Sequence, residues 1–261
     1  MFSATAFAGT SDIKASNNQV GTQFLLTHVG YTETGNGILG TTTGTIDTET
    51  GWVPGSALSI TTMKDWWLGN DYIEAEYNYS VGNTQYVGAL QDGGVYGSVV
   101  QPTGAKQDNC SARYGKGFVL NDEFMLTPYA ELGYHKWYRL VNNGEVYTHL
   151  YSGIGALGQY SPVNKLVFSA NAMLGSTFGS AIVVNGLKGF LGGLGNSTLY
   201  AVGASADYAF MKNLHGNVGV DYMSFKYGSS ALYPLGGGLF VWEPDSKTNY
   251  LTVKLGFGYA F

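Results

Sequence analysis

The chain has 261 residues, of which only 12% are charged, and its formal net charge at pH 7 is −5. Soluble domains carry about 25% charged residues, and a negative chain lacks the basic surface that a nucleic-acid partner requires. A single cysteine excludes an intrachain disulfide, and the absence of a long apolar run excludes a transmembrane helix. Few charges and many aromatic residues therefore predict a closed transmembrane β-barrel, in which all backbone groups pair internally.

The first residues contain Ala6-Phe7-Ala8, a small-residue pattern of the kind that signal peptidase cuts. We interpret residues 1–8 as the remnant of a signal peptide and residues 9–261 as a single barrel domain. The alternative is that the tripeptide occurs by chance.

Segments with a period of two residues predict the membrane strands. The predicted strands, in chain order, are 22–34, 54–67, 71–81, 108–120, 124–140, 147–160, 164–177, 197–210, 215–228 and 251–261. Long connections alternate with short turns along the chain, as outer loops and periplasmic turns do in such barrels. We predict an all-β, antiparallel up-and-down barrel of ten strands. Eight strands are the alternative, and 54–67 is the weakest of the ten.

The last strand shows the clearest alternation and ends in the sequence LGFGYAF. Together with LTPYAELGYHKWYR and EAEYNYSVGNTQYVG, this ending resembles the small outer-membrane β-barrel proteins of proteobacteria. The resemblance implies a location in the bacterial outer membrane and contact with its lipid and lipopolysaccharide. It also implies that Tyr259 and Phe261 contribute to recognition by the barrel-assembly machinery. The oligomeric state stays open.

On the predicted strands, charged residues alternate with the aromatic ones and occupy the same odd or even positions as Gly, Ser and Asn. They therefore lie on the face opposite the aromatic face. A charge that faces lipid near the midplane costs about 2–4 kcal/mol, so these side chains are expected in the lumen. The predicted lumen network is Glu74, Glu76, Arg113, Glu131, His135, Arg139, Lys165, Asp207, Asp221 and Lys254. Counting residues from the short turns and the carboxyl end places Asp221 and Lys254 at similar heights on neighbouring strands. The same count places Glu76, Arg113 and Glu131 at one height on three consecutive strands, which we call a row.

Two lysines have the opposite parity. Lys116 and Lys136 are expected near the membrane interfaces, where the ammonium can reach water.

Motifs with catalytic or cofactor chemistry are weak. GIGALG (153–158) matches a dinucleotide fingerprint, but no helix-period segment follows it. The histidines have no metal spacing, so neither a metal nor a cofactor is expected. His135 and His149 are predicted to face the lumen on neighbouring strands, and Glu131 is close to His135, which is the layout that a hydrolytic barrel needs. Omptin proteases and lipid A deacylases are barrels of this size, but their paired Asp and His-Ser patterns are missing here. We therefore prefer a hydrogen-bonded role for the histidines.

Two predicted outer loops, 179–195 and 229–244, are apolar and rich in glycine. Because loops normally run through water, this composition indicates contact with a ligand, a partner or the barrel itself. We prefer a non-enzymatic barrel that is structural or a narrow conduit for a small, apolar solute. An adhesion or assembly module that uses these loops is the second hypothesis. An outer-leaflet hydrolase that uses His135 or His149 is the third.

Overall fold

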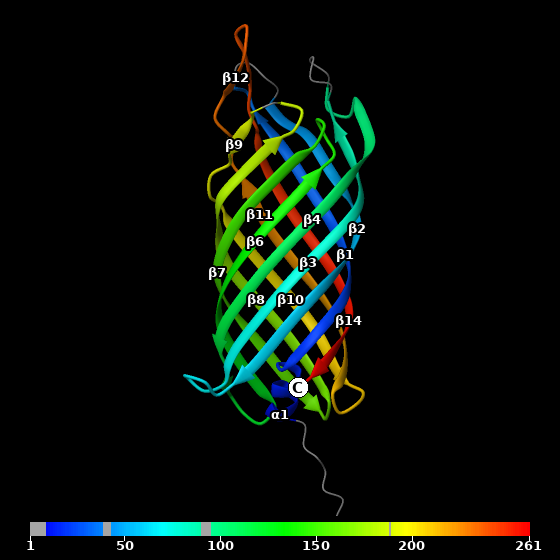
Figure 1. The fold of residues 1–261 in the computed structure, drawn as a ribbon, viewed down its shortest axis with the longest axis vertical. Helices are drawn as coiled ribbons and strands as arrows, with labels where there is room; N and C mark the ends of the chain where they lie inside the picture. The colour runs from blue at the N-terminus through cyan, green and yellow to red at the C-terminus, as the bar shows by residue number, and fades with distance from the viewer. Residues whose placement is uncertain (1–8, 39–42, 90–94, 188) are drawn as a thin grey trace, which may run out of the picture.

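The computed structural model describes residues 9–38, 43–89, 95–187 and 189–261, so the predicted signal-peptide remnant lies outside the described residues. Within these ranges, ten long strands form one closed antiparallel barrel, which confirms ten strands over eight (Figure 1). The wall strands are β1 (Gln19–Asn36), β2 (Thr43–Lys64), β3 (Asp71–Gly88), β4 (Val99–Lys116), β6 (Phe124–Arg139), β7 (Glu145–Val163), β8 (Leu166–Val184), β10 (Thr198–Ala209), β11 (Leu214–Tyr227) and β14 (Asp245–Ala260).

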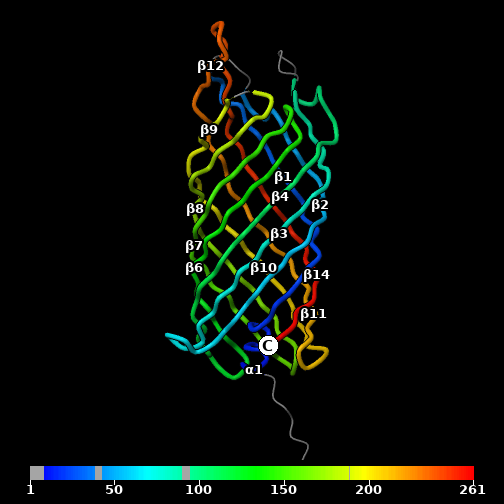
Figure 2. The backbone as a smooth tube through the Cα atoms, viewed as in Figure 1, coloured from blue at the N-terminus to red at the C-terminus, as the bar shows by residue number. Residues whose placement is uncertain are grey.

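The first and last wall strands close the barrel. β1 pairs with β14 from Gln19 opposite Ala260 to Thr34 opposite Asp245, and it pairs with β2 along its other edge. The tilted strands wind around a common axis, as the backbone trace shows (Figure 2). Because each wall strand has two neighbours, its backbone donors and acceptors are satisfied within the wall, as a bilayer requires.

Smaller elements lie at the two ends. The helix α1 (Thr10–Ser16) sits at the lower end of the barrel, with Ile13 fully buried (Figure 1). β5 (Phe118–Val119) extends the pairing of β6 there, and β9 (Leu191–Gly193) pairs with β8 at the upper end. β12 (Tyr233–Gly236) and β13 (Leu239–Val241) form a separate hairpin at the top.

The helix α1 was not predicted, because its 7 residues are too few to display a helical period. No helix in the described ranges is long and apolar enough to cross a membrane.

The two faces of the wall follow the predicted alternation. The side chains of Phe24, Val202 and Leu255 are exposed on the outside, whereas Leu25 points inward and is buried. On β2 the outward positions change from Leu58 near the lower end to Thr50 nearer the loops. A strand needs about 9–11 residues to cross the bilayer, and β2 has 22. The upper part of the barrel therefore projects beyond the apolar belt.

Several predicted boundaries are wrong at the loop end. β2 begins at residue 43 instead of 54, β3 continues to residue 88, and β8 continues to residue 184. Residues 179–184, predicted as loop, are therefore wall strand. The backbone ladder persists above the belt, but outward side chains there meet water. The apolar alternation that marks a membrane strand is consequently lost. At the lower end, β2 ends at residue 64, short of the predicted 67.

The outward face predicts the effect of a charge on membrane insertion. Replacing Val202 with Arg should destabilise the inserted barrel by about 2–4 kcal/mol, because the guanidinium would face hydrocarbon. The free energy of folding into vesicles, measured by urea titration, tests this. Val95→Arg is the matched control, since Val95 is exposed in the connection between β3 and β4. Equal stability of both variants would contradict the assignment of the lipid face.

Candidate functional site

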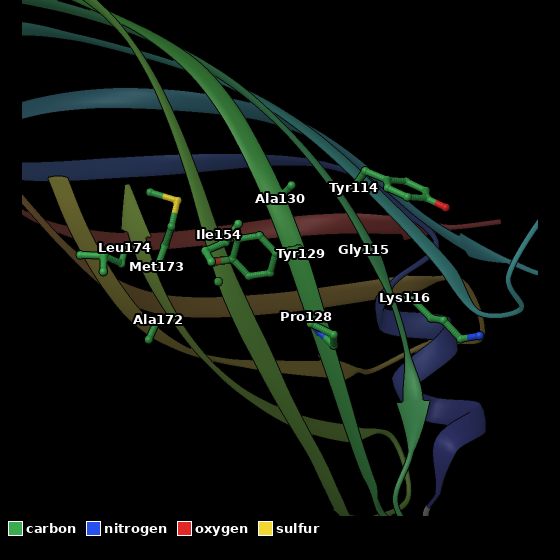
Figure 3. A pocket seen from close by; sticks show the side chains of 11 residues that line it. Tyr114, Gly115, Lys116, Pro128, Tyr129, Ala130, Ile154, Ala172, Met173 and Leu174 are labelled. Carbon is green, nitrogen blue, oxygen red and sulfur yellow. The ribbon is translucent and has the colours of Figure 1, made fainter. Parts of the chain in front are cut away.

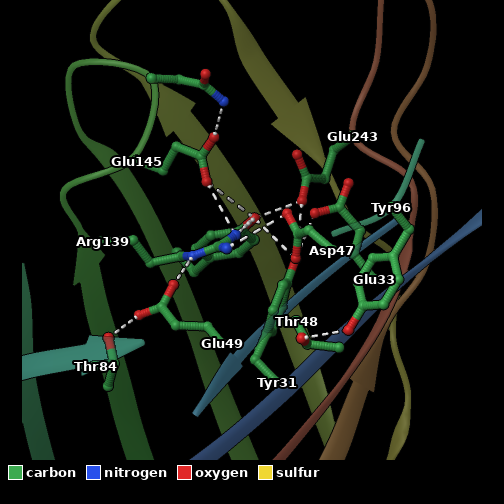
Figure 4. Close-up of polar contacts among 12 residues, drawn as sticks. Tyr31, Glu33, Asp47, Thr48, Glu49, Thr84, Tyr96, Arg139, Glu145 and Glu243 are labelled. Atoms are coloured by element: carbon green, nitrogen blue, oxygen red, sulfur yellow. Dashed lines mark hydrogen bonds and ion pairs between the residues drawn. The ribbon is translucent and has the colours of Figure 1, made fainter. Parts of the chain in front are cut away.

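The upper lumen contains a buried guanidinium surrounded by carboxylates (Figure 4). Arg139, the last residue of β6, contacts Glu49 at 2.7 Å, Glu145 at 3.1 Å and Asp47 at 3.5 Å. Asp47 and Glu49 lie two residues apart on β2 and share its inner face, while Glu145 lies opposite Arg139 in the β6–β7 register. We call these four residues the Arg139 cluster.

Aromatic rings enclose the Arg139 cluster. The guanidinium carbon lies 4.3 Å from the ring centre of Tyr31 and 5.2 Å from that of Trp137. The Tyr147 hydroxyl donates to Glu243 at 2.5 Å, so the connection before β14 is tied to the lumen. All of these side chains are buried. A guanidinium in such a place is stable only with close anionic partners.

Glu243 lies in this layer but outside the strands. Burial, with the nearby charge of Glu145, raises the pKa of Glu243 to about 8. At neutral pH its protonated form is therefore favoured, which limits the excess of negative charge around Arg139.

Sequence reasoning identified Arg139 but not its partners. Asp47 and Glu49 lie in a Thr-rich stretch without apolar alternation, so this stretch was not assigned to a strand. The spacing of two residues between Asp47 and Glu49, which puts both on one face of a strand, was the available signal. Glu145 was assigned to a loop, although it is the first residue of β7.

Below this layer lie the two lumen histidines. His135 and His149 are opposite each other on β6 and β7, with ring centres 5.0 Å apart. Asn109 and Tyr250 contact the ring nitrogens of His135, and the Tyr227 hydroxyl contacts Nδ1 of His149. Both imidazoles are thus held by neutral groups inside an aromatic layer.

The carboxylate that was expected to orient His135 has other partners. Glu131 accepts from Arg113 at 2.6 Å and from the Tyr151 hydroxyl at 3.0 Å. Arg113 also contacts Glu74 at 3.3 Å. The row on three consecutive strands is therefore Glu74, Arg113 and Glu131, and the prediction of Glu76 in this row is wrong. The β3–β4 register places Glu76 opposite Ser111.

Glu76 instead takes part in an ion pair across the lumen. Lys254 on β14 contacts Glu76 on β3 at 3.0 Å and Asp221 on the neighbouring strand β11 at 2.8 Å. The pair that was expected between Asp221 and Lys254 is therefore present, with a third member, Glu76, from a strand that is not their neighbour.

The lowest part of the lumen is polar. Asp207 contacts His215 at 2.5 Å and accepts a hydrogen bond from Gln19 at 3.2 Å. Lys165 is not in the lumen, so its prediction is wrong: it is exposed in the turn between β7 and β8, with a φ of 72°. The strand β8 begins only after this lysine, which the alternation did not reveal.

The terminal aromatic residues lie on the outer wall. Tyr259 is exposed and opposite Val20 of β1, and Phe261 directly follows β14. These positions leave both rings accessible from the membrane, and their role in assembly stays a prediction.

Two small cavities occupy the lower and middle lumen. The lower cavity, of about 190 Å³, is lined by polar residues above α1, and the middle cavity is about 100 Å³. Arg113, Glu76 and Lys254 line both, so this charged layer separates them. Within the described ranges, no group of His, Cys, Asp or Glu side chains is arranged to hold a metal ion.

Comparisons with solved structures agree with this architecture. The outer membrane protease OmpT from Escherichia coli matches with a TM-score of 0.57 and 10% identity, over 94% of this chain and 98% of its own. The chain has the fold of a small bacterial outer-membrane β-barrel protein. With its apolar outer wall, such a barrel lies in the outer membrane.

Two further barrels are similar at lower scores. The translocator domain of the autotransporter NalP from Neisseria meningitidis has a TM-score of 0.42 and 13% identity, over 93% of this chain and 89% of its own. OprG from Pseudomonas aeruginosa has a TM-score of 0.39 and 13% identity, over 94% of this chain and 98% of its own. The sequence matches no family model and no curated protein.

The Arg113 row predicts an unequal effect of two substitutions. Arg113→Ala leaves Glu74 and Glu131 without a cation, and breaking such a buried pair costs up to about 3–5 kcal/mol. Water in the adjoining cavities reduces this cost. Adding Glu131→Gln removes one uncompensated charge, so the double variant should unfold at a higher urea concentration than Arg113→Ala alone. Equal or lower stability of the double variant would contradict this account.

Glu243, which lies beside the Arg139 cluster, predicts a pH dependence of stability. A carboxyl whose pKa is raised on folding binds more protons in the folded state, so stability falls as pH rises from about 4.5 to about 8. Glu243→Gln should flatten this part of the profile of unfolding free energy against pH. Glu123→Gln, in an exposed turn, is the control and should leave the profile as it is. An unchanged slope in Glu243→Gln would contradict the assignment.

Proposed function

We propose that this protein is a non-enzymatic, structural outer-membrane barrel with a sealed interior, which presents an apolar hairpin at the cell surface. The observation that carries the first part is the packing of the upper lumen. The Arg139 cluster, Tyr31, Trp137 and Tyr147 form a cross-layer in which each side chain is buried. A conduit for solute would have to separate ion pairs in this layer.

The cavities also disfavour an apolar solute. Both lie below the Arg139 cluster, and charged or amide side chains such as Lys254, Glu76 and Asn171 line them. An apolar molecule in either cavity would displace water without replacing its hydrogen bonds to these groups. Of the two forms of our preferred hypothesis, the structural barrel is therefore better supported than the conduit.

The histidines offer little support for hydrolysis. His135 and His149 are buried below the Arg139 cluster, and their polar partners are Asn109, Tyr250 and Tyr227. A general base needs access to substrate and a group that orients its proton. The sealing layer blocks access to these rings from outside.

The two apolar outer segments differ in exposure. In 179–195, Ile182 is an inward residue of β8, and Phe190 and Leu194 are buried in the upper core, so the described part of this segment packs against the barrel itself. In 229–244, the β12–β13 hairpin exposes Leu239 by 66% and Phe240 by 45% above the rim. An exposed apolar surface of this kind favours contact with another surface. The hairpin therefore supports a second role in adhesion.

Conductance tests the sealed interior. The purified protein in a planar bilayer should show no discrete conductance steps, because Arg139 and its neighbours block the upper lumen. Conversion of Trp137, Tyr147 and Tyr31 together to Gly should create steps if this layer is the barrier. Discrete steps from the unaltered protein would refute the proposal.

Adhesion tests the hairpin. Cells that display the protein should adhere less to hydrophobic surfaces and to epithelial monolayers after replacement of Leu239 and Phe240 with Ser. Leu191→Ser is the matched control, because Leu191 is an exposed leucine outside the hairpin. Equal adhesion of the hairpin variant and the unaltered protein would exclude this role for the hairpin.

A further inference from the structure

The outer wall has a groove near its lower rim, on the face that meets lipid (Figure 3). The groove has a volume of about 760 Å³ and crosses β4, β6, β7 and β8. Its exposed lining is largely apolar and includes Pro128, Ala130, Ile154, Ala172 and Leu174. The groove is shallow and open to the bilayer, so it offers a surface along which an elongated apolar group can lie, and not an enclosed pocket.

A cation lies at one end of the groove. Lys116 is the last residue of β4, at the short-turn rim, and its outward parity directs its side chain to the membrane interface. Its ammonium donates to the carbonyl oxygen of Leu68 and lies 5.4 Å from the ring centre of Phe118. An ammonium has three donors, so the carbonyl leaves capacity for an anionic oxygen.

A tryptophan-bearing turn, residues 65–70, flanks this end and extends sideways from the lower rim (Figure 1, cyan). We call it the Trp turn. Its Trp66, Trp67 and Leu68 side chains are exposed, and the Trp67 ring lies 6.1 Å from that of Tyr114 in the groove. Tryptophan is enriched where hydrocarbon meets the headgroups. The turn therefore marks the height of the interface at the end of the groove.

The Trp turn is held in a fixed conformation. The Asp71 carboxylate accepts the backbone N–H groups of Trp66 and Trp67 at 2.9 and 2.8 Å, and the Tyr114 hydroxyl at 2.8 Å. Asp71 lies opposite Lys116 in the β3–β4 register, but its oxygens are engaged by these donors. The interfacial rings, Lys116 and the groove are thus organised before any ligand arrives.

We propose that this groove binds one phospholipid of the periplasmic leaflet, with an acyl chain along Ala130, Ile154 and Ala172 and an anionic headgroup at Lys116. The charge of Lys116 favours this occupant over a second copy of the chain. Its ammonium contacts the Trp turn, whose exposed rings mark the headgroup height, so a lipid phosphate can reach it. Attraction to anionic lipid is worth about 1 kcal/mol for each lysine near the membrane surface, which is about fivefold in affinity.

Native mass spectrometry of the full chain, titrated with phosphatidylglycerol in detergent, tests the headgroup contact. The unaltered protein should retain one lipid, and Lys116→Gln should weaken binding about fivefold. Lys136→Gln is the matched control, since Lys136 is also an outward lysine but lies near the upper end of β6, away from the groove. Equal affinity of Lys116→Gln and the unaltered protein would overturn the proposal, as would an equal loss in both variants.

A second pair of variants tests the acyl site. Ala172→Trp fills the groove and should abolish the tightly bound lipid, whereas Ala204→Trp, at an exposed position on β10, should not. Both changes are on the lipid face, and heat-modifiable migration on gels verifies that each variant is folded. Retention of the lipid by Ala172→Trp would overturn the proposal. If that variant instead loses a dimer and keeps the lipid, the groove is a contact between copies, which also overturns it.

Discussion

The closed ladder of backbone hydrogen bonds is the constraint on which the rest of this structure depends. In hydrocarbon an unpaired N–H or C=O costs several kcal/mol, so β1 must meet β14 throughout the apolar belt. Closure fixes two faces for each strand, one toward lipid and one toward the lumen. The outer face is then restricted to apolar side chains, and all remaining polar groups must be accommodated inside. The charged interior follows from the closed ladder.

The charged interior has its own requirement, which is that each of its buried cations has carboxylate partners. Arg113 and Lys254 each contact two carboxylates, and Arg139 contacts three. Removing one partner of a buried pair leaves a charge without compensation, so such a network holds its members in one arrangement. Several of these pairs join strands that are not neighbours. The contact between Lys254 on β14 and Glu76 on β3 spans part of the lumen and ties together two strands that β1 and β2 separate in the wall.

The alternation of 251–261 was sufficient to predict this strand and its lipid face, because its period of two matches an environment with lipid on one side and the lumen on the other. The number of ten strands came from counting all segments with this period. The same logic identified Arg139 and Lys254 as inward residues. It failed for the partners of Arg139, since Asp47 and Glu49 belong to a part of β2 that meets water outside. It failed for Glu76 because pairing depends on the register and on contacts across the lumen, and neither can be counted from turns. The helix α1 is too short to show a period, and its packing against β6, β7 and β8 creates its stability.

The distribution of polar and apolar groups between the outside and the inside of the barrel reverses along its axis, and this reversal bears on function. Within the apolar belt, lipid supports the outside and the interior contains polar cavities. Above the belt, water surrounds the outside, so stability there must come from a packed interior, as in a soluble protein. Trp137, Tyr147, Phe225 and Leu199 supply that core, and the Arg139 cluster lies within it. Opening a path for solute would remove the core from the part of the barrel that has no lipid to support it. Presenting a hairpin above the rim leaves that core intact, which is the physical reason to favour a surface role over a conduit.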